Sequence, residues 1–144
     1  MSGKVELNPS VARFIEENID LIELNEWNEV FANAETYRAN HFSADFVQEF
    51  KNAMLRADID PYPYLTYIPL TYFAFSPDLE EIVIDKKIDA EAFLGCKKLS
   101  KVTLTDKVIY IGDGAFQDCS SLKSIELPKN LELIGDDCFM DSGL

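Results

Sequence analysis

The sequence has few of the residues that enzymes use for acid–base or metal chemistry. Its 144 residues include one histidine, His41, and three cysteines, no two of which have the C-x-x-C spacing of a zinc site. A lone imidazole outside any motif is a poor candidate for a general base. Gly112-x-Gly114 lacks the third glycine of a dinucleotide-binding loop. We therefore predict no catalytic, cofactor-binding or metal-binding residues, and a protein that is not an enzyme.

Basic residues are scarce as well. Thirteen Lys and Arg stand against 26 Asp and Glu, which gives a formal net charge of -13. Proteins that bind nucleic acid or anionic membranes use Lys and Arg to displace counterions, so the charge argues against both kinds of partner. No stretch approaches the ~20 apolar residues that span a bilayer, and no basic start followed by an apolar run resembles a signal peptide. These absences favour a cytoplasmic location.

The sequence does contain an internal repeat. A leucine followed by apolar residues three and five positions later begins at Leu79, Leu99 and Leu122. Self-similarity at a period of 20 to 50 residues is typical of solenoids, in which each unit buries its apolar edge only by stacking on its neighbours. A second signal is phenylalanine at a constant interval of 23 residues, at Phe93, Phe116 and Phe139.

The residues after each leucine segment indicate the class of repeat. Two successive units read Val108-x-x-Ile111-Gly112-x-x-Ala115-Phe116-x-x-Cys119 and Pro128-x-x-Leu131-x-x-Ile134-Gly135-x-x-Cys138-Phe139. This pattern resembles the BspA-type, or Treponema pallidum-type, leucine-rich repeat over roughly the last half of the chain. The resemblance implies one short strand per repeat on one face, and a second extended piece with a helical turn on the other.

The N-terminal half has helical rather than repeat periodicity. Apolar residues from Val11 to Ile22 and from Trp27 to Ala34 follow helical spacing, and a third helix is expected over residues 43–57 with Ser43 as its N-cap. We therefore predict an α+β fold. Residues 1–66 form a helical capping domain, and residues 67–144 form a short leucine-rich-repeat solenoid of about three repeats.

The leading functional hypothesis is a non-enzymatic protein–protein interaction module of leucine-rich-repeat type. Proteins with similar repeats are found in bacteria and phages, so the resemblance also suggests a phage or mobile-element gene. Leucine-rich repeats commonly bind through the side chains that point outward from their strands. Because side chains alternate along a strand, the candidate binding residues form two columns. One column is Glu81, Lys101 and Ser124, and the other is Val83, Thr103 and Glu126.

The alternative hypothesis depends on an acidic stretch. Residues 14–37 contain seven acids and neither Lys nor Arg. If the first part is helical, four of the acids share one broad face: Glu16, Glu17, Asp20 and Glu23. A solvated helix face is the ordinary explanation. The alternative is an acidic surface that imitates DNA phosphates and inhibits a host nucleic-acid enzyme by binding its basic groove, as an anti-CRISPR protein would.

Two expectations follow from the repeat alignment. Cys96 and Cys119 share one repeat position and Cys138 occupies another inward position, so all three should be buried and reduced. The last repeat would leave apolar side chains such as Leu127 and Ile134 without a neighbour on one side. A homodimer that buries this C-terminal edge is therefore expected.

Overall fold

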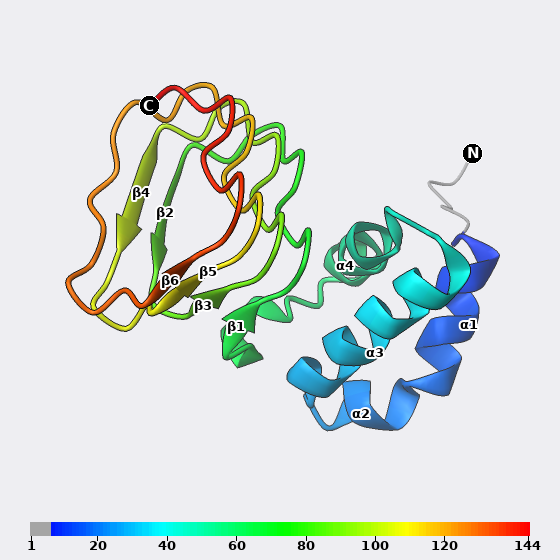
Figure 1. The fold of residues 1–144 in the computed structure, drawn as a ribbon. Helices are drawn as coiled ribbons and strands as arrows, with labels where there is room; N and C mark the ends of the chain where they lie inside the picture. The colour runs from blue at the N-terminus through cyan, green and yellow to red at the C-terminus, as the bar shows by residue number, and fades with distance from the viewer. Residues whose placement is uncertain (1–6) are drawn as a thin grey trace. The chain divides into compact units, whose positions relative to one another are not determined.

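The computed structural model describes residues 7–144 and divides the chain into two compact units, residues 1–65 and 66–144. The first unit is helical, and the second contains short parallel strands (Figure 1). The predicted α+β class is confirmed. Capping of the repeats by the helical unit stays a prediction.

Over its described residues, 7–65, the helical unit contains four α-helices and a short 3-10 turn. The first helix begins where the sequence favours it, because Pro9 occupies the first turn and the Asn8 side chain accepts a hydrogen bond from the backbone N–H of Ser10 at 2.8 Å. Phe14 lies at the centre of the unit, with ring centroids 5.2 Å from Phe46 and 5.0 Å from Phe50. The elements are α1 (Pro9–Glu17), α2 (Ile19–Glu23), α3 (Trp27–His41), α4 (Phe46–Arg56) and η1 (Tyr62–Tyr64).

The expected start of the third predicted helix is wrong. This helix, α4, begins at Phe46 with Asp45 in the N-cap position and no side-chain cap. Ser43 instead belongs to the end of α3: its N–H donates to the carbonyl of Arg38 at 3.1 Å, after Phe42 has reversed the chain with a φ of 50°. The residue that resembles an N-cap therefore lies in the preceding turn.

The repeat unit contains two separate parallel ladders of strands. Four two-residue strands pair in the order β1 (Tyr67–Ile68), β3 (Lys87–Ile88), β5 (Tyr110–Ile111) and β6 (Leu133–Ile134). The second ladder contains only β2 (Glu81–Ile84) and β4 (Lys101–Leu104). We call one turn of the chain around these ladders a coil. Each coil places its leucine-rich segment on one side and its second extended piece on the other (Figure 1).

The phenylalanines form the continuous core that their interval predicted. Phe73, one coil earlier than the first predicted member, stacks on Phe93 at 5.2 Å between ring centroids. Phe93 stacks on Phe116 at 5.0 Å and Phe116 on Phe139 at 5.7 Å, with interplanar angles of 4° and 7°. Phe93 and Phe116 are fully buried. The stacking of Phe93, Phe116 and Phe139 is confirmed.

Two backbone positions in every coil adopt the left-handed conformation, four residues apart around the phenylalanine. The sequence did not indicate them, because most of the equivalent positions are occupied by unlike residues. Hydrogen bonds between coils hold this turn: the N–H of Phe93 donates to the carbonyl of Ala115, and that of Phe116 to the carbonyl of Cys138, at 2.8 and 2.9 Å. The positions, with φ between 54° and 68°, are Thr71, Glu91, Gly114 and Asp137, and then Phe75, Gly95, Asp118 and Asp141.

Candidate functional site

The outward side chains of β2 and β4 form a regular surface, which we call the strand face. The parallel register places Glu81 beside Lys101 and Val83 beside Thr103. All four are exposed, and Val83 exposes 64% of its surface. The alternate residues point inward, as Ile84 does with no exposure. Two of the three predicted rows of each column therefore lie side by side.

The strand face is hollowed rather than flat. A shallow cavity of about 260 Å³ is lined by β2 and β4. Its walls offer one carboxylate, one ammonium group, one hydroxyl and one exposed valine. Protein contact surfaces usually combine apolar side chains with charged and polar groups, as this one does. The lining residues are Glu81, Ile82, Val83, Lys101 and Thr103.

The third predicted row departs from this arrangement. Residues 124–126 belong to no strand, and among residues 7–144 β4 pairs only with β2. A groove of 200 Å³ separates β4 from this segment, with residues 100–104 on one wall and residues 124–126 on the other. Figure 1 shows the orange segment bowing away from β4. Ser124 and Glu126 are exposed, but they do not continue the columns of the strand face.

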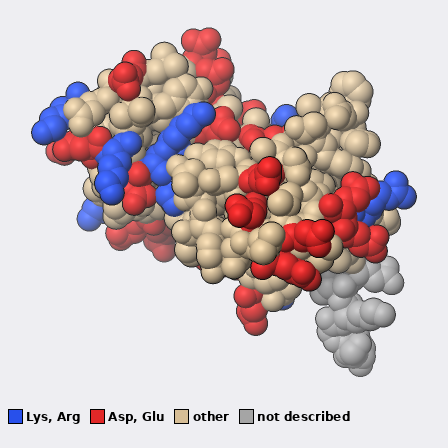
Figure 2. Space-filling view, turned by 90° about the horizontal axis from the view of Figure 1, so that it is seen from below, with Lys and Arg blue, Asp and Glu red and all other residues tan. Residues whose placement is uncertain are grey.

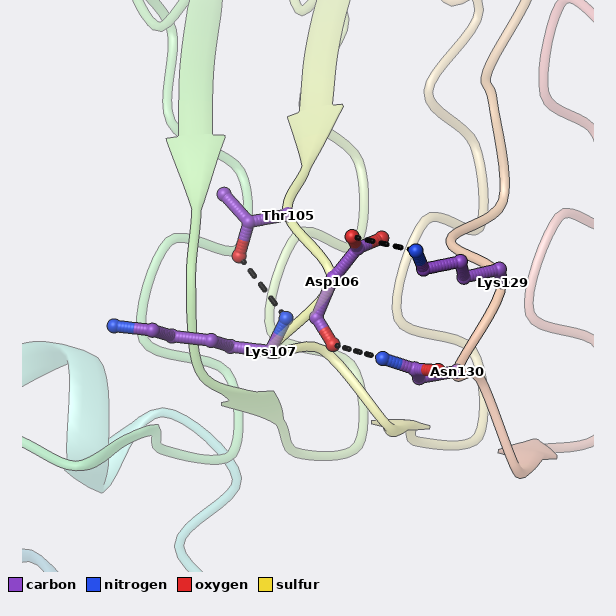
Figure 3. A network of polar contacts seen from close by, with 5 residues as sticks. All are labelled: Thr105, Asp106, Lys107, Lys129 and Asn130. Atoms are coloured by element: carbon purple, nitrogen blue, oxygen red, sulfur yellow. Dashed lines mark hydrogen bonds and ion pairs between the residues drawn. The ribbon is translucent and has the colours of Figure 1, made fainter.

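The turn after β4 connects the groove's two walls at one end (Figure 3). The side chain of Asn130 donates to the backbone carbonyl of Asp106 at 3.3 Å, and the Lys129 ammonium lies 3.8 Å from the Asp106 carboxylate. Within the turn, the N–H of Lys107 donates to the hydroxyl of Thr105 at 3.3 Å. Lys129 and Asp106 are largely exposed, so water weakens their attraction and the ion pair contributes little to stability.

The four candidate acidic residues lie on two helices rather than one. Glu16 and Glu17 end α1, Asp20 and Glu23 belong to α2, and all four are exposed. The break falls at the buried Asn18, whose side-chain N–H donates to the carbonyl of Phe14 at 2.9 Å. Figure 2 shows carboxylates predominating on the visible face of the helical unit. Within residues 7–144, none of the four forms an ion pair.

The cysteines are buried free thiols. The thiol of Cys96 donates to the carbonyl of Phe73 at 3.0 Å, and that of Cys119 to the carbonyl of Phe93 at 3.1 Å. The hydrogen bond with Cys96, together with burial, raises the pKa of Cys119. Burial raises the pKa of Cys138 from 9.0 to about 11. The expectation that these side chains are buried is confirmed, and the raised pKa values make them poor nucleophiles at neutral pH.

We expect the free energy of unfolding to decrease as the pH rises from 9 through about 11, in part through Cys138. Its pKa is higher in the folded than in the unfolded state, so its contribution is fully present below pH 9 and is lost as the folded thiol ionises. Chemical denaturation across this range measures the loss. The matched control is Cys138→Ala, because alanine occupies the same repeat position at Ala92 and Ala115. Equal pH dependence in both proteins would contradict the assignment.

His41, the one histidine, is part of a small aromatic contact. Its ring stacks on Tyr37 with centroids 3.8 Å apart, and its Nδ1 lies 3.0 Å from the carbonyl of Tyr37. The residues that the structure describes contain no group of three or more His, Cys, Asp or Glu side chains that could hold a metal ion. Over the same residues, no helix is both long and apolar enough to cross a bilayer.

A family comparison accounts for the repeat unit. The family described as BspA type leucine rich repeat region matches residues 66–144, in six copies. The chain belongs to the BspA-type leucine-rich repeat family. Comparison with curated proteins and with solved structures found no significant match. The BspA-type repeats thus supply both the strand face and the groove beside it.

The last BspA-type coil exposes several large apolar side chains. They flank or follow the bowed segment, so the edge of this coil is not covered within the described residues. The predicted homodimer through this edge stays a prediction, which light scattering across a range of concentrations would test. The exposed fractions are 49% for Leu127, 54% for Leu133, 39% for Ile134 and 44% for Met140.

Proposed function

We propose that this protein is a non-enzymatic protein-interaction module. Its leucine-rich repeats form a short solenoid, and the strand face binds a protein partner. The observation that carries the proposal is the register of β2 and β4, which places an acid beside a base and an exposed valine beside a threonine over one shallow cavity. A partner that covers the exposed valine would gain the free energy of burying it, and the charges beside it would orient that partner.

We also infer which residues of the strand face contact the partner. Glu81, Val83, Lys101 and Thr103 form the primary contact, and Ser124 and Glu126 extend it when they approach β4. The partner is a protein, and the acidic chain favours one with a basic surface. A phage or mobile-element origin and a cytoplasmic location fit this role.

A specific observation favours a second candidate function. Four exposed carboxylates on α1 and α2 lie without ion pairs within the part of the chain that the structure describes. Such a surface suits an inhibitor that imitates nucleic-acid phosphates and binds the basic groove of a host enzyme. Affinity of this kind would fall steeply with ionic strength, whereas contact through the strand face would change little.

One binding experiment tests the two candidates. A partner is captured from lysate and identified, and its affinity is then measured by calorimetry with purified variants. Val83→Lys combined with Thr103→Glu alters the strand face at unchanged net charge, and we expect it to weaken binding by about 10-fold or more. The matched control, Ile109→Lys with Ser120→Glu, changes exposed residues outside the strands by the same charges and should bind within about twofold.

The third arm reverses Glu16, Glu17, Asp20 and Glu23 to lysine. If the strand face is the site, this variant loses less affinity than the strand-face variant, because charges outside the contact change mainly the rate of association. Loss of binding in this arm alone, with a steep salt dependence in the original protein, would replace the leading proposal with the phosphate-mimicking one. Circular dichroism of each variant establishes that the fold is retained.

A further inference from the structure

We propose that residues 123–127 act as a latch that swings onto the open edge of β4 and closes the groove. In the closed state these residues form a third parallel strand beside β4. The latch regulates the strand face, so its functional consequence depends on the function proposed above, but closure itself is a property of the free protein.

The geometry of the groove indicates that residues 123–127, rather than a separate chain, fill it. Leu122 is fully buried at one end of the segment, and Lys129 and Asn130 contact Asp106 at the other end. Both ends are therefore held to the preceding coil, while the middle bows outward (Figures 1 and 3). The held ends keep the segment beside β4 at a high effective concentration that a separate chain does not have.

The segment has the length and pattern that β4 requires. Leu122, Ile125 and Leu127 are each 23 residues beyond Leu99, Val102 and Leu104, so no residue need be inserted or removed to pair the two segments. Closure places Ile125 beside Val102, and Leu127, now 49% exposed, beside Leu104. It also places Ser124 beside Lys101 and Glu126 beside Thr103, which avoids like charges in direct opposition.

The backbone of β4 supplies unused hydrogen-bonding groups for this pairing. The N–H of Lys101 donates to the carbonyl of Glu80 at 3.2 Å, and that of Thr105 to the carbonyl of Ile84 at 3.0 Å. Alternate residues of a strand direct their backbone groups to opposite sides, so Val102 and Leu104 direct theirs into the groove. A third strand satisfies three of these four groups, since the carbonyls of Ser124 and Glu126 accept from Val102 and Leu104, and the N–H of Glu126 donates to the carbonyl of Val102. The carbonyl of Leu104 would face Pro128, which has no N–H to donate.

Closure changes the surface that a partner can contact. The open state presents two rows of each column, whereas the closed state adds Ser124 and Glu126 as a third row. A partner that contacts all three rows binds the closed state more tightly and therefore increases its population. The ladder β1, β3, β5 and β6 already extends through the last coil, so closure does not require that ladder to move.

Amide hydrogen exchange, followed residue by residue by NMR on the free protein, tests the latch. Closure should slow exchange of the Val102 and Leu104 amides by at least about 10-fold relative to an unstructured chain. The amides of Lys101 and Thr103, which face β2, serve as the internal reference. Glu126→Pro removes the N–H that would donate to the carbonyl of Val102, so it should abolish protection at Val102 and Leu104 alone. Glu126→Ala is the matched control and should retain it.

Three results would overturn the proposal. In the first, Val102 and Leu104 exchange as in an unstructured chain. In the second, their protection survives Glu126→Pro, so that burial rather than pairing explains it. In the third, protection disappears on tenfold dilution, which would make a second copy the occupant. Unchanged partner binding in the strand-face variant, with protection at Val102 and Leu104 intact, would instead contradict the proposed function alone.

If Glu126→Pro does not fold, disulfide formation between two introduced cysteines tests closure instead. Paired residues of neighbouring strands lie ~4.8 Å apart, within the range that a disulfide can bridge. Thr103→Cys with Glu126→Cys should therefore form an intramolecular disulfide under mild oxidation. Val83→Cys with Thr103→Cys is the positive control, because that pair is already in register. A bridge in the control pair only would overturn closure.

Discussion

Replacing Phe116 with alanine is expected to lower the free energy of unfolding of the repeat unit by about 3 to 5 kcal/mol. Phe116 is fully buried, and its ring stacks on Phe93 on one side and on Phe139 on the other. The stacked coils hold the walls of the vacated space, so they can collapse only partly into it. The cost is therefore the lost transfer free energy together with that of a cavity.

The measurement must follow the repeat unit itself. Trp27 is the only tryptophan and belongs to α3, so its fluorescence reports the helical unit. Unfolding by denaturant should therefore be monitored through amide hydrogen exchange in β3 and β5, which lie in the repeat unit. Phe139→Ala is the matched comparison, because Phe139 is half-buried and has one stacked neighbour. A loss below about 1 kcal/mol for Phe116→Ala would contradict the ladder.

Gly112→Ala is expected to be nearly as damaging, with a loss of about 3 kcal/mol, at the upper end of overpacking costs. A Cβ at Gly112 would lie 2.6 Å from the backbone nitrogen of Ala90 and 2.7 Å from the carbonyl carbon of Asp89. These atoms belong to the neighbouring coil and cannot rotate away. The N–H of Gly112 also donates to the carbonyl of Ile88 at 2.9 Å, so any shift weakens the pairing of β3 with β5.

Gly114→Asp is the matched control for this prediction and should cost less, about 1 to 2 kcal/mol. Gly114 has a φ of 61°, but its Cβ would meet first the flexible end of Gln117, at 3.0 Å. Asp137 occupies the same repeat position with a φ of 55°, so an aspartate is accepted there. Thermal unfolding of both variants compares them directly. If both variants lost the same stability, the left-handed backbone conformation, rather than close approach between coils, would decide which glycine is required.

Much of the candidate site follows from alternation along the strands. Glu81, Val83, Lys101 and Thr103 could be assigned to one face because successive side chains of a strand point to opposite sides. The same reasoning placed Ser124 and Glu126 in the third row, where the structure instead has a groove. The pattern of apolar residues in residues 122–127 equals that in residues 99–104, which include β4, so nothing in this pattern distinguishes the paired segment from the bowed one.

The sequence by itself determined the family, the spacing of the coils and the phenylalanine ladder, because these depend on which residues are apolar and how far apart they lie. Only the tertiary structure decided the open edge of β4, the left-handed positions and the place of Ser43. Each of these depends on backbone hydrogen bonds between residues that are distant along the chain or in a neighbouring turn. Backbone groups are the same in nearly every residue type, so the order of side chains carries no direct record of which of them pair.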